Sequence, residues 1–173
     1  MKKILVGVVI AAVILVLAFY AVNSYIYREK QGDTGFQPDY KDINYTIEEQ
    51  MVTLHDGVAE TGSTVTRYFG NEAEGDLNND GISDLVFLLT QETGGTGIFY
   101  YVVVALKTDT GYQGTNAVLL GDRIAPQTTE TRMGQVIVNY AERLAGEPMT
   151  TRPSVGVSKY LEVQGTNLVE AKP

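Results

Sequence analysis

The chain has 173 residues, enough for one domain with appendages, and it holds 13 Lys and Arg against 21 Asp and Glu, one His and no Cys. The lack of Cys excludes disulfides, thiolate metal sites, a cysteine nucleophile and a lipidated cysteine, and a single His argues against the usual zinc sites. The first 30 residues contain four of the basic and one of the acidic side chains, which leaves nine basic against 20 acidic in the remainder. Because such an acidic region repels phosphate backbones, we expect no nucleic-acid partner.

The N-terminal segment is the most apolar part of the chain. Ile4 to Val22 is a run of 19 residues without a charge, and as a helix it would cover about 28 Å, close to the hydrocarbon thickness of a bilayer. We predict a transmembrane anchor over residues 1–27, with the short basic N-terminus inside and the acidic domain on the extracytoplasmic side. The alternative is a cleaved signal peptide with a cleavage site near Val22-Asn23-Ser24, in which case the protein is secreted.

The segment after the anchor shows no hydrophobic periodicity. Residues 28–42 contain Gly32, Gly35 and Pro38, which disfavour a helix. We therefore predict a flexible linker over residues 28–42, followed by a β-rich extracytoplasmic domain over residues 43–173.

Strand-like runs recur roughly every 8–15 residues along that domain. Each run alternates apolar and polar residues or is rich in β-branched and aromatic ones. Leu85 to Leu89 is apolar throughout, which predicts a central strand buried on both faces. The pattern favours a single all-β fold, either an antiparallel sandwich or a curled, barrel-like meander, with a short helix near Tyr40 to Gln50 as an alternative for its first part. The predicted strands are residues 43–47, 51–54, 64–69, 85–89, 98–106, 117–120, 135–140 and 155–163.

The most specific motif lies just before that central run. Gly75 to Asp84 contains the pattern D-x-N-x-D-G-x-x-D. Calcium binds six to eight oxygens in irregular geometry, and a tight loop can supply them from alternate positions around Gly81, which permits the sharp turn. We predict one calcium ion in the loop 76–84. Its ligands are the side chains of Asp76, Asn78 and Asp80, the carbonyl of Ile82, and Asp84 directly or through water.

This loop is not an EF-hand, because position 12 is Phe87 rather than a bidentate Glu and no helical pattern flanks it. Its ten residues resemble the calcium turns of dockerins, of integrin-type FG-GAP repeats and of thrombospondin-type repeats. The resemblance implies the chemistry of the site and not the fold. Without a bidentate ligand we expect a dissociation constant on the order of 10⁻⁴–10⁻³ M. The alternative is an Asp/Asn/Gly-rich turn that joins two strands without a metal.

Longer stretches of the domain resemble a group of uncharacterised bacterial envelope proteins. The similarity covers about residues 43–163 and implies an envelope location and a single folded unit, but no activity. The stretches that carry it are Arg67 to Gly70, the loop 76–84, Leu88 to Gly97, Ala117 to Ile124, Val138 to Tyr140, Gly146 to Pro148 and Pro153 to Gly156.

The sequence contains no recognised catalytic motif. It has no G-x-S-x-G elbow, and Thr93 to Gly97 lacks the phosphate-loop register. His55 beside Asp56-Gly57 is typical of a turn, and the acids Asp122, Glu130, Glu142 and Glu147 have no spacing that joins them. We expect a non-enzymatic, membrane-anchored module for binding or surface architecture, with a protein or glycan partner. The alternatives are a hydrolase of envelope polymers with a structural calcium ion, and a subunit of an envelope complex.

Overall fold

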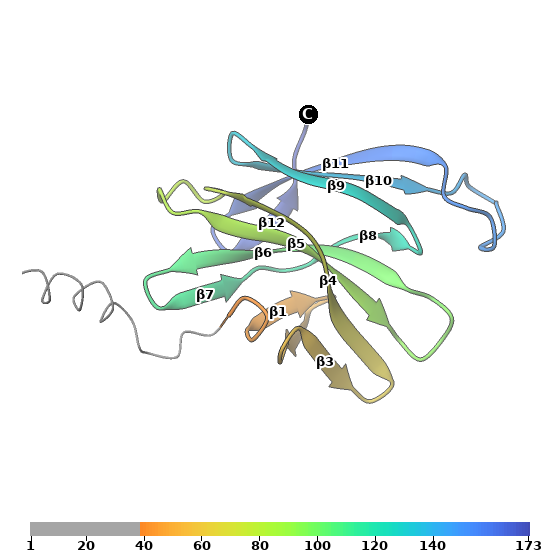
Figure 1. Cartoon of the computed structure of the whole chain (residues 1–173), viewed down its shortest axis with the longest axis horizontal. Helices are drawn as coiled ribbons and strands as arrows, with labels where there is room; N and C mark the ends of the chain where they lie inside the picture. The colour runs from red at the N-terminus through yellow and green to blue at the C-terminus, as the bar shows by residue number, and fades with distance from the viewer. Residues whose placement is uncertain (1–38) are drawn as a thin grey trace, which may run out of the picture. The chain divides into compact units, whose positions relative to one another are not determined.

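The computed structural model describes residues 39–173, which form an all-β domain (Figure 1). The short helix considered near Tyr40 to Gln50 is wrong, because two strands and the tight turn between them occupy residues 44–53. Within the described residues no helix could span a bilayer, and the anchor predicted over residues 1–27 lies outside them. The strands are β1 (Asn44–Ile47), β2 (Gln50–Thr53), β3 (Val58–Thr61), β4 (Thr64–Gly75), β5 (Asp84–Glu92), β6 (Phe99–Thr108), β7 (Gly111–Gly114), β8 (Val118–Asp122), β9 (Ala125–Arg132), β10 (Gln135–Glu142), β11 (Val155–Gln164) and β12 (Asn167–Glu170).

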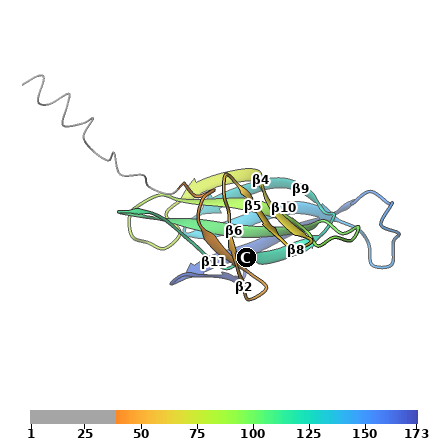
Figure 2. The ribbon, with the colours of Figure 1, turned by 90° about the horizontal axis from the view of Figure 1, so that it is seen from below.

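These strands form three antiparallel sheets. The largest has the order β3-β4-β5-β6-β7, with β8 also paired to β6, and it curls into a half-barrel. The second has the order β12-β11-β10-β9, and the third is the hairpin β1-β2. Figure 1 shows the β9–β12 sheet on one side of β5 and β6, with β1 and β3 on the other. Seen from below in Figure 2, the long central strands of the two larger sheets run in roughly the same direction.

β5 and β6 are buried on both faces because each face meets a different layer. Successive side chains of a strand point to opposite faces, so alternate residues enter separate cores. This arrangement confirms the prediction of a central strand at Leu85 to Leu89. One core joins Val86, Leu88, Val102 and Val104 to Val136, Val138 and Leu161 of the four-stranded sheet. The other joins Leu85, Phe87, Leu89, Tyr101 and Val103 to Tyr45, Ile47 and Leu54 around the β1-β2 hairpin.

The β1-β2 hairpin is attached to the segment that follows β7. The Thr46 N–H donates to the Thr115 carbonyl at 3.2 Å, and the Ala117 N–H donates to the Thr46 carbonyl at 2.7 Å. These two segments approach so closely that a Cβ at Gly114 would lie 2.1 Å from the Asn44 carbonyl oxygen. A residue without a side chain is therefore required at this seam.

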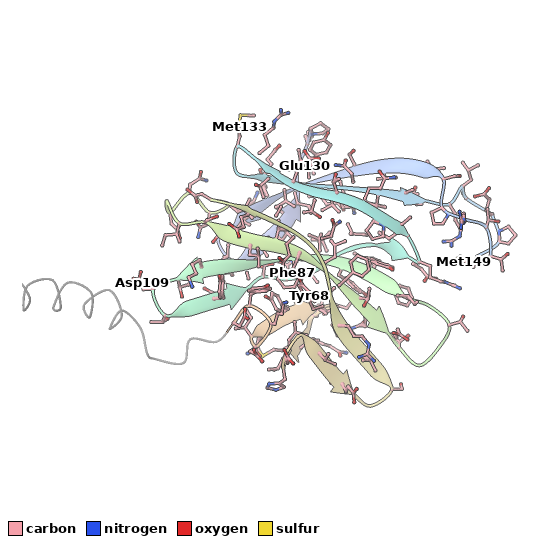
Figure 3. All side chains as sticks on the ribbon, in the orientation of Figure 1. Tyr68, Phe87, Asp109, Glu130, Met133 and Met149 are labelled. Atoms are coloured by element: carbon pink, nitrogen blue, oxygen red, sulfur yellow. The ribbon has the colours of Figure 1, made fainter. Side chains whose placement is uncertain are left out.

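The packed domain begins slightly before residue 43. Tyr40, which the sequence assigns to the linker, lies with its ring centroid 5.5 Å from that of Phe87 and 5.8 Å from that of Tyr112. The Tyr45 hydroxyl donates to the Tyr40 carbonyl at 2.7 Å. Figure 3 shows Tyr68 and Phe87 together beneath the central sheet, where their ring centroids are 5.4 Å apart.

Candidate metal centre

The predicted calcium loop connects the end of β4 to the start of β5. The two carboxylate oxygens of Asp76 accept hydrogen bonds from the amides of Asp80 at 3.1 Å and Gly81 at 3.0 Å. The Asn78 side-chain oxygen also accepts from the Asp80 amide, at 3.0 Å. The loop is therefore wrapped around the side chains of its own first and third positions.

Two backbone conformations make this wrapping possible. Asn79 has φ 61° and Gly81 has φ 84°, both in the left-handed region that Gly adopts freely and that Asn tolerates better than most residues. A Cβ at Gly81 would meet no atom within 4 Å, so its φ rather than crowding explains why Gly suits this position.

Asp80 completes the inward-facing set. One of its carboxylate oxygens accepts from the Ile82 amide at 2.8 Å, and the other accepts from the Asn78 side-chain amide at 2.8 Å. Three of the four predicted side-chain ligands, Asp76, Asn78 and Asp80, are thus gathered by the loop. Together they present two carboxylates and one amide carbonyl, which are the oxygen donors that calcium prefers.

Asp84 lies beneath the loop, with only 1% of its surface exposed. Its carboxylate accepts from the Leu77 amide at 3.0 Å and from the Lys107 amide at 2.8 Å. Burial raises the pKa of Asp84, the two amide hydrogen bonds oppose this effect, and the charges of Asp80 and Asp76 add to it. Asp84, predicted as a calcium ligand, therefore also accepts hydrogen bonds from two backbone amides, and these bonds connect the loop to β6.

Ile82, predicted to contribute its carbonyl, has an exposed side chain, and its amide donates to Asp80. Among the described residues, no three His, Cys, Asp or Glu side chains come together closely enough to hold a metal ion. That grouping does not include the oxygens of Asn78 and of the Ile82 backbone, which belong to the predicted set. The loop therefore offers a mixed donor set rather than a cluster of carboxylates.

The β9-β10 hairpin supports the loop from one side. The Thr131 hydroxyl donates to the Glu74 carbonyl, and a Cβ at Gly75 would lie 2.7 Å from the Thr131 Oγ1. Gly75 therefore allows β9 to approach the strand that enters the loop. Met133 marks the outer tip of this hairpin in Figure 3. These contacts could not be read from the sequence, in which residues 125–132 lacked a strand signal.

A tyrosine cluster lies on the other side of the loop. The hydroxyls of Tyr40 and Tyr68 both donate to Glu72 Oε1, and the Lys41 ammonium lies 3.9 Å from the Tyr68 ring centroid. Burial and the bond to Glu72 raise the pKa of Tyr68 to about 12. A hollow of about 330 Å³ separates Tyr40 from Asp84.

The remaining titratable candidates lie on separate elements. His55 is exposed in the turn between β2 and β3, and the side chains of Glu130 and Glu142 are exposed on β9 and β10. Asp122 accepts two hydrogen bonds from Arg123, at 3.1 Å each. Comparisons of the chain with protein-family models, with curated proteins and with solved structures find no match. Functional inference therefore depends on the chemistry of these residues.

Proposed function

We propose that the loop 76–84 binds one calcium ion, and that the domain is a non-enzymatic binding or structural module on the extracytoplasmic side of a membrane. The observation that supports the ion site is the convergence of Asp76, Asn78 and Asp80 on the amides of a single tight loop. The apolar run Ile4 to Val22 and the acidic remainder of the chain support the location.

The hydrogen bonds of the loop prepare its oxygens for a hard cation. Backbone amides fix Asp76 and Asp80 in place, so little side-chain freedom remains to be lost on binding. The Asp80 oxygen that now accepts from Asn78 is the one that would turn to the ion. Each Asp84 oxygen retains a second lone pair beyond its amide bond, so ligation by Asp84, directly or through water, is part of the proposal.

The expected affinity matches an extracytoplasmic role. A dissociation constant of ~0.1 mM at about 1 mM calcium would stabilise the domain by about 1.4 kcal/mol. That free energy is enough to fix a loop, while the two apolar cores hold the sheets together. Calcium therefore acts here as a structural ion.

Isothermal titration of the full-length protein with calcium, together with melting in EDTA and in ~5 mM calcium, tests the ion site. We expect binding heat and a higher melting temperature with calcium. Asp76→Asn should abolish both, because it removes one of the charges that the loop presents. Asp56→Asn is the control, since it removes one carboxylate charge from an exposed turn outside the loop. Absence of heat and of any melting shift in the wild-type protein would reject the site.

Protease treatment of intact cells tests the location separately. The domain should be degraded from outside while a cytoplasmic marker survives, and the protein should sediment with membranes after washing at high salt. A protected domain would place it on the inner side, and a soluble domain in the medium would indicate cleavage after the apolar run.

A further inference from the structure

The hairpin formed by β2 and β3 is closed at only one rung. Its turn, Asp56-Gly57, has φ 49° and 78°, and the His55 and Val58 backbones exchange hydrogen bonds of 2.8 and 3.1 Å beside it. Beyond this bridge, within the described residues, β2 pairs only with β1 and β3 pairs only with β4. The two arms of the hairpin therefore diverge where a regular hairpin would continue.

Both diverging arms have an unpaired backbone edge. In the β1-β2 and β3-β4 hairpins, the two residues that flank the turn exchange two backbone hydrogen bonds. Further along each hairpin, hydrogen-bonded pairs alternate with non-hydrogen-bonded pairs. Counting from the turns in the observed registers, Met51 and Thr53 of β2 direct their N–H and C=O groups away from β1, and Glu60 of β3 directs its own away from β4. Of these edge residues, Met51 borders the cleft between the arms.

A cleft of about 300 Å³ lies between the arms. Three consecutive residues of β2, 50–52, line one side, which is the pattern of a strand seen along its edge. The floor is the face of the curled sheet that buries Leu89 further along β5. Within the cleft this face of the sheet is polar. The buried Gln91 side chain donates to the buried Thr66 hydroxyl at 3.2 Å. The floor residues are Ala59, Thr61, Thr64, Thr66, Gln91 and Thr93.

A fixed carboxylate stands at the mouth of this cleft. Glu48 and Glu49 form the β1-β2 turn with φ 48° and 67°, a conformation that costs free energy in a residue other than Gly or Asn. The buried Tyr101 donates its hydroxyl to Glu48 Oε1 at 2.8 Å. No Lys, Arg or His is among the residues that line the cleft, so the Glu48 charge has no basic partner there.

We propose that this cleft binds an extended peptide strand that carries a Lys or Arg side chain. The strand lies beside β2 over this floor, bonds to the free edge at Met51, and pairs its cation with Glu48. The Thr hydroxyls and the Gln91 amide of the floor form hydrogen bonds with the polar side chains of the peptide. The cleft and the ion loop lie at opposite ends of β5, about 23 Å apart along the strand, so the inference does not depend on calcium.

The test uses a fluorescent, end-blocked peptide of sequence Val-Lys-Val-Thr-Val-Lys-Val and the full-length protein. Binding is followed by anisotropy, in EDTA and in calcium, with the same affinity expected in both. A peptide with Glu in place of Lys should bind at least tenfold more weakly. A peptide methylated on alternate backbone nitrogens should not bind, because it cannot donate to the edge. This last control leaves the protein unchanged and therefore separates recognition from folding.

Variants of the protein test the edge itself. Met51→Pro removes the outward N–H, which an edge strand tolerates because that group is outside the β1 ladder, and it should weaken binding more than tenfold. Met51→Ala keeps the N–H and should change the affinity less than twofold. Glu48→Gln should weaken the Lys peptide about three- to tenfold and leave the Glu peptide no weaker. No binding up to 1 mM peptide, or equal binding by the methylated peptide, would overturn the proposal. A dimer without peptide that Met51→Pro dissociates would assign the cleft to a second copy and also overturn it.

Discussion

Replacing Asp84 by Ala should destabilise the domain by about 2–4 kcal/mol in EDTA. The Asp84 carboxylate is 1% exposed and accepts hydrogen bonds from the amides of Leu77 and Lys107. Its removal leaves both amides without a partner, and each such group costs about 1–3 kcal/mol. The raised pKa of Asp84 shows that burial of its charge is itself unfavourable, so the loss should fall in the lower part of the summed range.

Two further variants isolate the cause. Asp84→Asn retains one oxygen and should lose about 1–2 kcal/mol, since one amide keeps its partner. Asp76→Ala removes the same charge from the same loop, but Asp76 is exposed and water can replace its oxygens, so the loss should stay below about 1 kcal/mol. Urea denaturation followed by circular dichroism measures all three. Equal losses for Asp84→Ala and Asp76→Ala would refute the assignment of the loop's attachment to the two amides.

Two other predictions concern the seam at β7 and the tyrosine cluster. Gly114→Ala should cost more than about 3 kcal/mol in denaturation, because its Cβ would overlap the Asn44 carbonyl. Gly156→Ala, with open space around its Cβ, should change stability by less than about 0.5 kcal/mol, and equal effects would contradict the close approach of β1. The pKa of Tyr68 near 12 in the folded state means that the unfolded chain loses its proton first, at about pH 10. Stability should therefore fall as pH rises from 10 to 12. Tyrosinate absorbance measures the ionisation of the tyrosines, and circular dichroism reports the fold. If every tyrosine were ionised at pH 10 while the fold stayed intact, the prediction would be wrong.

The central strand could be predicted because its surroundings leave a simple signal. No position of Leu85 to Leu89 faces water, so every residue is apolar. β9 leaves no such signal, since Thr129 is its one buried residue and pairing with β10 holds it in place. The extension of β4 to Gly75 was also missed. Asn71, with φ 58° and register shifts around it, interrupts the alternation there.

The ion loop likewise has one part that the sequence predicts and one part that it does not. The spacing of Asp76, Asn78 and Asp80 predicted side chains that face one loop, because those contacts are local in sequence. The partner of Asp84 on β6 is 23 residues away and becomes a neighbour only when β5 and β6 pair. The cleft between β2 and β3 depends likewise on the divergence of two arms, and neither arm carries a sequence signal for it. Glu48 and Glu49 are good helix formers in sequence, yet both adopt left-handed conformations at a hairpin turn.

The double burial of β5 and β6 has a consequence for how the domain loses its structure. Each strand contributes one face to each apolar core, so the two cores are built on the same pair of strands. The backbone amides of Val86 to Leu88 and Val102 to Val104 should exchange with deuterium only when the whole molecule opens. We therefore expect the two clusters of apolar side chains to melt as one cooperative unit.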